Sequence, residues 1–287
     1  MYHIILNPVS GKKKALKNLR VLEEQFQQNG VGYELHKTCA VRDAEDIARH
    51  ITEQGAEKLI VLGGDGTLHE VLNGIVDPSR CTLGLIPSGT GNDFAGKIGI
   101  PLKAEKAVHK ILGGQAREID YLDVGGVRCM NVAGLGMDVD VLERCQRGKM
   151  KGKIKYLMSL IKSLFAFKGY PIIVYNDGKE ETHDALLAAV CNGSQFGGGI
   201  RICPDSVVDD GKIDVVVVEC IGSKMKIIKA FIELMKGKIL SYHATTHFRA
   251  EQVRFQPKTP CTVQLDGELY RGLDFNVKLC KGLKMYY

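Results

Sequence analysis

The sequence predicts an α/β domain with a parallel sheet, followed by a second domain that is mainly antiparallel β. Short apolar strands alternate with amphipathic helices up to about residue 120, which is the pattern of a parallel sheet with helices on its faces. Beyond that point strand patterns dominate. The chain has 287 residues, which at about 150 residues per domain agrees with two domains. We therefore expect domains at 1–120 and 121–287.

The first domain is predicted to alternate strand and helix from its start. Strands are expected at 3–6, 31–37, 59–62 and 82–86, and helices at 13–29, 43–54, from Leu68 onward and at 103–112. Apolar residues recur near helical spacing in the first helix; they are Leu16, Leu19, Val21, Leu22 and Phe26. Gly30 ends that helix, and Pro87 closes the fourth strand. A linker near 113–122 is expected to lead into the second domain.

The second domain is predicted to consist mainly of consecutive strands. They are expected at 127–132, 170–176, 184–191, 213–219, 252–256, 261–266 and 274–280. Asn176-Asp177-Gly178 lies between two of these strands and is typical of a hairpin turn. The run IDVVVVE at 213–219 predicts a strand that is buried on both faces. Two helices, at roughly 138–166 and 223–238, interrupt the strands.

The composition is that of an ordinary globular protein, with 45% hydrophobic and 25% charged residues. No run of about 18 or more apolar residues occurs, so no transmembrane segment is expected. The beginning, MYHIILNPVSG, has no basic stretch before its apolar residues and is expected to form a strand, not a signal peptide. The net charge of +6 is too small to indicate nucleic acid, but it suits an anionic substrate or a membrane surface.

Cysteine and histidine give no sign of a metal site in the sequence. The nine cysteines are irregularly spaced and include no CxxC pair, which argues against a zinc site or a redox dithiol. They indicate a reducing, cytoplasmic setting. The eight histidines include no HExxH motif, and His243 and His247 lack a third ligand nearby. We therefore expect that the histidines do not bind metal.

The stretch LIVLGGDGTLHEVLNGIV at 59–76 is the most informative part of the chain. A buried strand ends at Gly63 and Gly64, and a helical pattern begins at Leu68. Glycine lets the backbone come close to phosphates, and a helix start offers unpaired N–H groups to an anion. Asp65 lies inside this turn, where a carboxylate repels phosphate unless a divalent cation or a transferable proton lies between them. The combination predicts phosphoryl transfer, with Asp65 holding or orienting a catalytic Mg²⁺.

Three further turns rich in polar and small residues are expected at the same edge of the sheet. Residues 7–11 follow the first strand, Thr38 follows the second, and residues 88–93 follow the fourth. Because ligands bind beyond the carboxyl ends of the strands in an open parallel sheet, the four turns predict one shared phosphate site. Lys12 and Lys13 either add positive charge there or are solvated lysines at a helix start. Neither GxxxxGK[ST] nor the Rossmann GxGxxG with a later acidic residue occurs.

Five motifs together carry a resemblance to a known family. They are Asn7-Pro8-Val9-Ser10-Gly11, Gly63-Gly64-Asp65-Gly66-Thr67, Gly89-Thr90-Gly91-Asn92-Asp93-Phe94-Ala95, Pro204 with Asp209-Asp210-Gly211-Lys212-Ile213-Asp214, and Leu265-Asp266-Gly267-Glu268. As a set they resemble the diacylglycerol kinase catalytic family, and more closely its bacterial soluble lipid kinases, relatives of sphingosine and ceramide kinases. The resemblance implies an NAD kinase/diacylglycerol kinase-like α/β domain with a parallel sheet and a C-terminal, mainly antiparallel β-sandwich-like domain. The active site is then expected in the cleft.

The resemblance also implies a set of site residues. ATP-binding positions match Asn7, Pro8, Val9, Ser10, Gly11, Thr38, Gly64, Asp65, Gly66, Thr67, Leu68, His69, Glu70 and Thr90. Glu268 matches the proton acceptor, with Asp266 a rival for that catalytic role. These two residues alternate by two, so both can face one side of a strand, although Asp-Gly is also a common hairpin turn. At His69 the family usually has Asn.

A structural magnesium site is implied at Val207, Asp210 and Lys212. In the family's pattern Asp210 gives its carboxylate to the ion, and the other two residues give their carbonyl oxygens. This site is expected in addition to the Mg²⁺ that accompanies ATP.

A lipid substrate has to be reached at a membrane surface, and two basic segments could make this peripheral contact. They are RGKMKGKIK at 147–155 and SKMKIIKAFIELMKGK at 223–238. The apolar residues on one helical face of the second segment are Met225, Ile228, Ile232 and Met235. With lysines around them they are typical of a helix on an anionic membrane. Helical spacing alone favours the alternative, an ordinary helix that packs this face on the sheet.

The sequence therefore predicts an ATP- and Mg²⁺-dependent lipid kinase that phosphorylates a hydroxyl of a diacylglycerol-like lipid, in the cytoplasm at the membrane surface. An NAD kinase-like small-molecule kinase is one alternative, and the motifs at 7–11, 89–95 and 265–268 argue against it. An inactive nucleotide-dependent membrane-binding regulator is another, and the acidic residues kept in the motifs argue against that. The identity of the lipid and the choice of nucleotide stay open, as does a homodimer.

Overall fold

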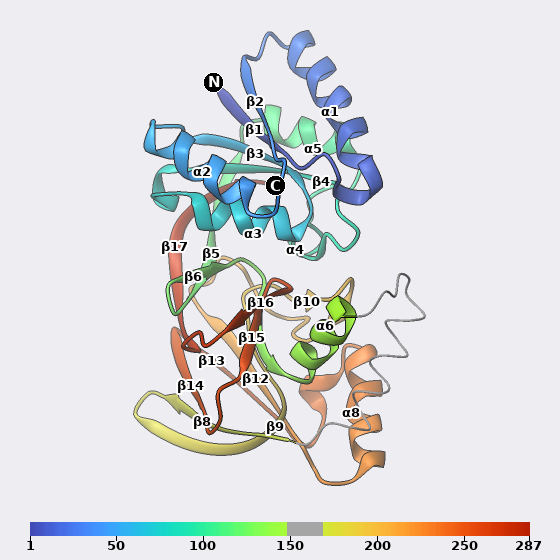
Figure 1. The fold of residues 1–287 in the computed structure, drawn as a ribbon, viewed down its shortest axis with the longest axis vertical. Helices are drawn as coiled ribbons and strands as arrows, with labels where there is room; N and C mark the ends of the chain where they lie inside the picture. Colours follow the sequence, from blue (N-terminus) through green and yellow to red (C-terminus); the bar gives the residue numbers. More distant parts are fainter. Residues whose placement is uncertain (148–168) are drawn as a thin grey trace.

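The computed structural model describes residues 1–147 and 169–287 (Figure 1). The chain folds into two lobes, and both ends of the chain lie in the first. Among the residues that the structure describes, no helix has both the length and the apolar character needed to cross a membrane.

A parallel sheet forms the centre of the first lobe. Its strands are β1 (Tyr2–Leu6), β2 (Tyr33–Lys37), β3 (Lys58–Gly63) and β4 (Thr82–Pro87), in the order β2-β1-β3-β4. All three pairings are parallel. Residues 4–6 of β1 and 59–62 of β3 are fully buried, in agreement with the apolar runs in the sequence.

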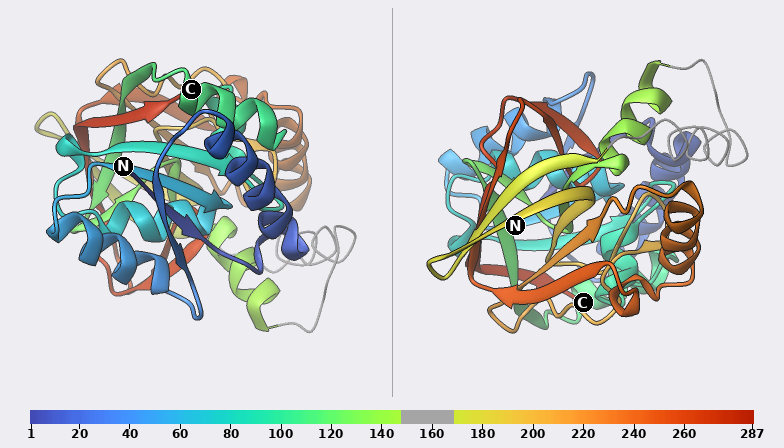
Figure 2. Two further views of the ribbon diagram at one scale, coloured as in Figure 1. Left: turned by 90° about the horizontal axis from the view of Figure 1, so that it is seen from above. Right: turned by 90° about the horizontal axis from the view of Figure 1, so that it is seen from below.

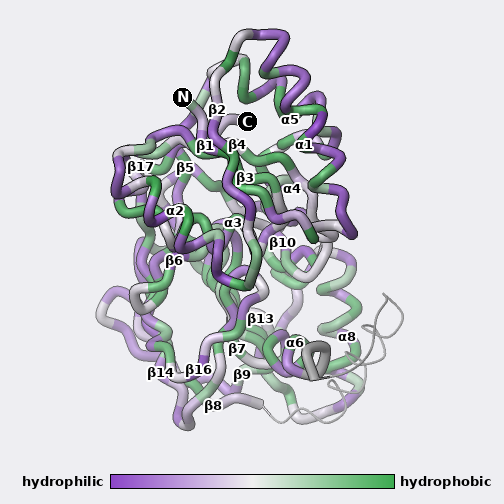
Figure 3. Tube along the Cα trace, turned by 45° about the horizontal axis from the view of Figure 1, so that its top comes forward, coloured by the Kyte–Doolittle hydropathy of each residue, from purple (hydrophilic) through white to green (hydrophobic). Residues whose placement is uncertain are grey.

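Five helices accompany this sheet: α1 (Ser10–Gln28), α2 (Asp43–Glu53), α3 (Asp65–Gly74), α4 (Asp93–Lys97) and α5 (Ala104–Leu112). α1 packs with α5, and α2 packs with α3 on the opposite face of the sheet (Figure 2). In the hydropathy view hydrophobic segments run along the strands, while α1 is largely hydrophilic on its outer side (Figure 3). The core between them therefore draws on one apolar stripe of each helix.

The second lobe consists mainly of antiparallel strands. They are β5 (Ala116–Val124), β6 (Val127–Cys129), β7 (Val132–Gly136), β8 (Tyr170–Asn176), β9 (Lys179–Cys191), β10 (Gln195–Phe196), β11 (Ile200–Arg201), β12 (Ile213–Glu219), β13 (Thr245–Ala250), β14 (Gln252–Pro257), β15 (Thr262–Leu265), β16 (Glu268–Arg271) and β17 (Asn276–Tyr286). Helices α6 (Met137–Arg147) and α8 (Lys224–Met235) lie beside this sheet (Figure 1). Short 3₁₀ turns occur at Pro78–Arg80 and Ile239–Ser241.

The last strand joins the two lobes. β17 pairs antiparallel with β14 and β5 and parallel with β4 of the first sheet. Near its end, Leu283 and Met285 are fully buried in the core of the first lobe. The division at residue 120 stays a prediction, and the end of the chain returns across it.

The fold class predicted from the sequence is confirmed, and so is the hairpin at Asn176-Asp177-Gly178. β8 and β9 pair from Asn176 and Lys179 outward. Asp177 (φ 48°) and Gly178 (φ 76°) occupy the left-handed region that a two-residue type I′ turn requires.

The predicted linker near 113–122 is wrong, because most of these residues form β5. Charged side chains at Arg117, Glu118 and Asp120 interrupt the apolar pattern that would have indicated a strand. Asp120 is nevertheless buried, since its carboxylate accepts a hydrogen bond of 2.8 Å from the Gly211 N–H. The elements α4, β10, β11, β13 and β16 were also not predicted from the sequence.

Candidate active site

The two glycine turns that follow β3 and β4 touch backbone to backbone. A Cβ atom on Gly64 would lie 2.8 Å from the Cα of Gly89, and a Cβ on Gly89 would lie 2.6 Å from the Cα of Gly64. The Ser88 N–H also donates to the Gly63 carbonyl at 2.7 Å. A larger residue at either contact would push the turns apart, so close approach explains these two glycines.

The turn after β1 joins this pair. The Asn7 amide nitrogen donates to Thr67 Oγ1 at 3.1 Å, which ties it to the glycine turn. Gly11 has φ 57°, and a Cβ there would lie 1.9 Å from the Ser88 carbonyl oxygen. Thr38, at the end of β2, donates its N–H to the Leu6 carbonyl at 2.9 Å. The four turns therefore lie at one edge of the sheet, as the strand–helix alternation predicts.

Asp65 begins α3 and points toward the start of α4. Its two carboxylate oxygens accept hydrogen bonds from the backbone N–H groups of Asp93 and Phe94, at 3.1 and 3.3 Å. Burial raises the pKa of Asp65, and the nearby carboxylates of Asp93 and Asp266 raise it further. Three acidic side chains from two lobes thus lie close together, which is an arrangement that a cation relieves.

Asp266 is enclosed by hydrogen-bond donors. Its carboxylate accepts hydrogen bonds from the backbone N–H groups of Met130, Asn131 and Val132 at 2.8, 2.8 and 3.3 Å. The Cys129 thiol lies at 3.1 Å and His69 Nδ1 at 3.0 Å from it. Burial alone would raise the pKa of Asp266, but these hydrogen bonds outweigh it and lower the pKa.

Glu268 lies two residues later and has different surroundings. Asp266 (φ 53°) and Gly267 (φ 91°) form the tight turn of the β15–β16 hairpin, so Glu268 starts the returning strand. Its Oε1 lies 3.4 Å from the position that a Cβ on Gly66 would take. Glu268 therefore faces the glycine turn of the other lobe. Partial burial by the surrounding residues raises the pKa of Glu268, although its side chain keeps contact with solvent.

His69 connects the two lobes. Its ring is almost fully buried, with Nδ1 against Asp266 and Nε2 2.7 Å from the Tyr270 hydroxyl. An ionised carboxylate only accepts hydrogen bonds, so His69 Nδ1 donates to Asp266, while Nε2 shares a hydrogen bond with the Tyr270 hydroxyl. Burial raises the pKa of Tyr270 to about 12, which keeps that hydroxyl a donor. His69 thus contacts the hairpin of the second lobe.

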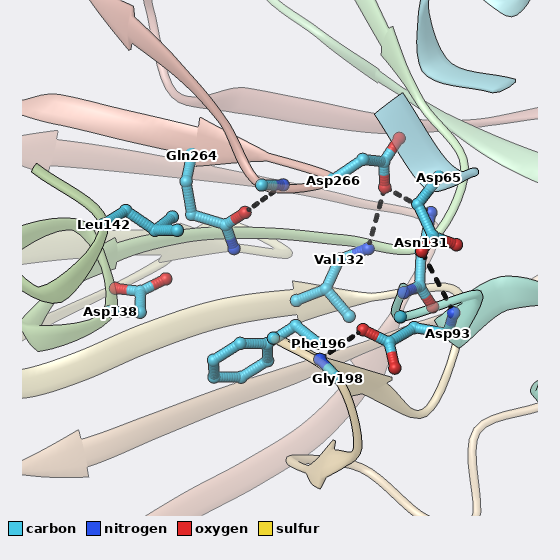
Figure 4. Close-up of a pocket in the computed structure, with 13 residues that line it drawn as sticks. Asp65, Asp93, Asn131, Val132, Asp138, Leu142, Phe196, Gly198, Gln264 and Asp266 are labelled. Carbon is cyan, nitrogen blue, oxygen red and sulfur yellow. Dashed lines mark hydrogen bonds between the residues drawn. The ribbon is translucent and has the colours of Figure 1, made fainter. Parts of the chain in front are cut away.

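A cavity of about 200 Å³ lies between the lobes beside these residues (Figure 4). Its lining includes Asp65, Asp93, Asp138, Gln264 and Asp266. Asp93 links the walls, since its carboxylate accepts hydrogen bonds from Gln195 Nε2 at 3.1 Å and the Gly198 N–H at 2.8 Å. The sequence placed Asp93 in the fourth turn without a role.

Asp138 is the residue in this cavity that sequence reasoning missed. It is 7% exposed, and neither carboxylate oxygen makes a well-formed hydrogen bond. Burial raises its pKa to about 7, although Gln264 and the Val139 N–H are near enough to offset part of the rise. Gln264 Nε2 and Asn131 Oδ1, both buried, also lack partners. In the sequence, Asp138 is an ordinary aspartate in the first turn of a helix, and nothing local signals its burial.

The predicted magnesium loop lies apart from Asp65 and is held by protein groups. The Asp210 carboxylate is ion-paired with Arg249 and accepts the Lys212 N–H at 3.0 Å. The side chain of Val207 is exposed. Asp210 is the one carboxylate of the three predicted ligands, and protein groups contact both of its oxygens.

Of the two basic segments predicted to contact a membrane, the structure describes the whole of the second but not of the first. Residues 148–155 of the first lie outside the described residues. In the second, α8 packs inward through Ile227, Ala230 and Leu234. The face named from the sequence is turned outward instead; Met225, Ile232 and Met235 are 73, 44 and 53% exposed. The prediction that this face packs on the sheet is therefore wrong for these residues.

The chain is similar to known proteins over almost its whole length. Residues 1–124 match the diacylglycerol kinase catalytic domain, and residues 131–281 match the YegS C-terminal NAD kinase beta sandwich-like domain. It is 30% identical over 276 residues to "Diacylglycerol kinase" of Bacillus subtilis (strain 168), covering 94% of this chain and 90% of that one. It is 29% identical over 295 residues to "Probable lipid kinase YegS-like" of Stenotrophomonas maltophilia (strain K279a), covering 98% and 94%.

A solved structure leads to the same family. A diacylglycerol kinase structure from Bacillus anthracis str. Sterne superposes with a TM-score of 0.81 at 26% identity, covering 100% of this chain and 96% of that one. Together with the sequence relatives, this agrees with the resemblance stated from the motifs. The chain belongs to the diacylglycerol kinase family, among the lipid kinases that combine its catalytic domain with a YegS-type β-sandwich-like domain.

Proposed function

We propose that this protein is an ATP- and Mg²⁺-dependent lipid kinase that transfers the γ-phosphoryl group of ATP to a hydroxyl of a diacylglycerol-like lipid. One observation carries the proposal: Glu268 of the second lobe lies against Gly66 in the glycine turn of the first. A phosphate-binding turn and a carboxylate with a raised pKa then lie together where a lipid hydroxyl can attack the γ-phosphoryl group.

The turns after β1, β3 and β4, which contact one another, support the binding of a nucleotide at this end of the site. The backbone N–H groups from Gly64 to Thr67 start α3, where a helix favours anionic ligands. Asn7 and Gly11 lie beside them and bring the turn after β1 to the same place. Phosphoryl transfer asks the protein mainly to position the phosphates and stabilise their charge, and this arrangement supplies both. The preference for ATP comes from the family.

Mg²⁺ fits the acidic group between the lobes. Asp65 and Asp93 would hold it, since carboxylate oxygens are the ligands that Mg²⁺ prefers. When bound, it supplies charge neutralisation on the phosphates. Burial raises the pKa of Asp65 and the carboxylates of Asp93 and Asp266 add to the rise, and a bound cation would relieve the crowding of these charges. The separate site at Val207, Asp210 and Lys212 stays a prediction.

The two acidic residues of the hairpin take different roles in this proposal. Glu268 accepts the proton of the lipid hydroxyl, because its pKa is raised and its carboxylate is open to solvent and to the glycine turn. Asp266 is a positioning residue, since five donors already hold its carboxylate and its lowered pKa makes it a weak base. The hydrogen bond between His69 and Asp266 holds the β15–β16 hairpin against α3.

The acceptor lipid is proposed to enter the cavity of Asp138. Unpaired buried polar groups are costly, and the ester oxygens of a glycerolipid would accept hydrogen bonds from Gln264 Nε2 and from the protonated carboxyl of Asp138. Apolar hollows of about 20 and 10 Å³ continue from the cavity between α6 and α8. Each has room for about one water molecule, so acyl chains can enter only if this seam opens.

The exposed face of α8 is proposed as the contact with the membrane. Met225, Ile232 and Met235 face outward from the helix that borders the seam. Lys226 and Lys229 lie exposed beside them, and lysines near apolar residues favour an anionic lipid surface. The protein would then work in the cytoplasm as a peripheral enzyme that takes its substrate directly from the bilayer.

The proposal is tested with purified protein, γ-labelled ATP, MgCl₂ and a panel of diacylglycerols, other lipids with free hydroxyls, and NAD. We expect label in the organic phase with a diacylglycerol-like acceptor and none without Mg²⁺. Label that stays in water as a phosphorylated dinucleotide would identify an NAD kinase. Nucleotide binding without product on any acceptor would identify an inactive regulator.

A further inference from the structure

A cluster of two histidines and a glutamate lies away from the phosphate site, on the edge of the first sheet. His3 belongs to β1, and Glu34 and His36 belong to the neighbouring strand β2. In the parallel register His3 is opposite Glu34, and Ile5 is opposite His36. Because side chains alternate along a strand, His3, Glu34 and His36 project from the same face of the sheet.

The ligand atoms of the three side chains converge on one point. His3 Nδ1 and His36 Nε2 are 3.3 Å apart. The Glu34 carboxylate oxygens lie 3.6 Å from His3 Nδ1 and 3.8 Å from His36 Nε2. A tetrahedral zinc ion with bonds of about 2.0–2.1 Å separates two imidazole nitrogens by about 3.3 Å. At 3.3 Å the two ring nitrogens share a hydrogen bond, and a metal ion that replaced its proton would hold them at nearly the same distance.

The surroundings allow an ion to reach the cluster. The His3 and His36 side chains are 14 and 18% exposed, whereas that of Glu34 is 55% exposed. The two rings stack at 5.5 Å with an interplanar angle of 15°, which fixes their directions. A cavity of about 470 Å³, bordered by His3, Glu34 and Gln54, opens beside them. His3 and His36 would therefore be fixed ligands and Glu34 an adjustable one, and the fourth coordination position would be open.

We propose that His3, Glu34 and His36 form a binding site for a divalent transition metal, best matched by Zn²⁺. Two imidazoles and one carboxylate suit Zn²⁺ or Co²⁺, whereas Mg²⁺ prefers oxygen ligands. The site is thus chemically distinct from the cation that accompanies ATP. β2 is an edge strand, paired with β1 alone along the main path of the sheet. The bound metal ties β2 to β1 two residues before Thr38.

The sequence alone does not reveal this group, and from it the histidines are expected not to bind metal. Its ligands come from two strands about 30 residues apart, so no local spacing signals it. One other group of potential ligands occurs among the described residues, at Cys203, Asp214 and His247. Two of its three members are buried, and Asp214 is already 2.7 Å from His247 Nε2. An experiment has to separate the two groups.

The test is a titration of the tag-free, metal-stripped full-length protein with Co²⁺ and with Zn²⁺. We expect one equivalent of Co²⁺ with the strong visible absorption of a tetrahedral site, and without the thiolate charge-transfer band that Cys203 would add. Zn²⁺ should displace it and raise the melting temperature, while excess MgCl₂ should do neither.

Four variants assign the site. His36→Gln and Glu34→Gln should each weaken Co²⁺ binding by about ten-fold or more, since even second-shell losses cost about 10–100-fold. His109→Gln, an exposed histidine on α5, is the matched control and should bind as the wild type does. Glu34 is exposed, so its variant is expected to fold, which the melting curve of the apoprotein checks. Unchanged Co²⁺ affinity in both variants, or a band that disappears in Cys203→Ser, would overturn the proposal.

Discussion

His69 Nδ1 lies 3.0 Å from Asp266 Oδ2, so a buried hydrogen bond joins α3 of the first lobe to the β15–β16 hairpin of the second. The same hairpin carries Glu268, whose carboxylate lies against Gly66. The histidine link therefore holds the hairpin where its glutamate faces the glycine turn. It also distinguishes the two candidates for the proton acceptor, because the Asp266 carboxylate is held by hydrogen bonds within the protein and the Glu268 carboxylate is not.

Asp266→Asn should reduce the acid sensitivity of the fold. The lowered pKa means that the ionised Asp266 stabilises the folded protein above about pH 4, and that this contribution is lost as the pH falls through the folded-state value. Asparagine presents N–H groups to donors, so at pH 7 the variant should lose on the order of 3 kcal/mol in the free energy of unfolding. Urea unfolding at pH 7, 5 and 3 measures both effects. An equal loss at all three pH values would contradict this role.

Asp138→Asn should stabilise the protein at alkaline pH. With a folded-state pKa of about 7, the carboxyl is neutral in the fold where it is already ionised in the unfolded chain. The neutral Asp138 carboxyl therefore makes its full contribution to the free energy of unfolding below about pH 4, and this contribution is lost as the pH rises to about 7. The variant cannot ionise, so it should exceed the wild type by on the order of 3 kcal/mol at pH 8 and match it at pH 4. A difference that does not vary with pH would speak against the buried, unpaired carboxyl.

Gly64→Ala should disturb the phosphate site through close packing. The new Cβ would lie 2.8 Å from the Cα of Gly89, so the two turns have to separate. We expect a loss of about 1–3 kcal/mol in stability together with a raised KM for ATP. Gly32→Ala is the matched control, because a Cβ there meets nothing within 4 Å. Equal ATP KM values in the two variants would show that the contact between the turns does not matter.

The sequence predicted the strands, helices and turns that local patterns determine. The alternation of apolar runs and glycine turns was enough to place 7–11, Thr38 and 63–67 at one edge of a sheet. The roles of Asp138 and Asp266 could not be predicted, because the burial of one and the donors around the other come from segments far apart in the chain. β5 was missed for a similar reason, because its buried Asp120 is hydrogen-bonded by Gly211 of a loop far along the chain.

Replacing the outward methionines of α8 should weaken membrane binding. The double variant Met225→Ser/Met235→Ser removes two exposed apolar side chains that would enter the bilayer, and we expect binding to anionic vesicles to fall by about ten-fold. Leu102→Ser/Val76→Ser, exposed on the first lobe, is the control and should pellet with vesicles as the wild type does. Co-sedimentation at low salt measures both. Equal binding of all three proteins would place the membrane contact elsewhere.

The most direct measurement is lipid phosphorylation by Glu268→Gln beside the wild type, with γ-labelled ATP, MgCl₂ and diacylglycerol in mixed micelles. Gln keeps the size of Glu268 but cannot accept the hydroxyl proton, so kcat should fall by about 10²–10⁴-fold while the KM for ATP changes little. An unchanged melting curve confirms the fold of the variant. A kcat near that of the wild type would contradict the assignment of Glu268 as the proton acceptor between the two lobes.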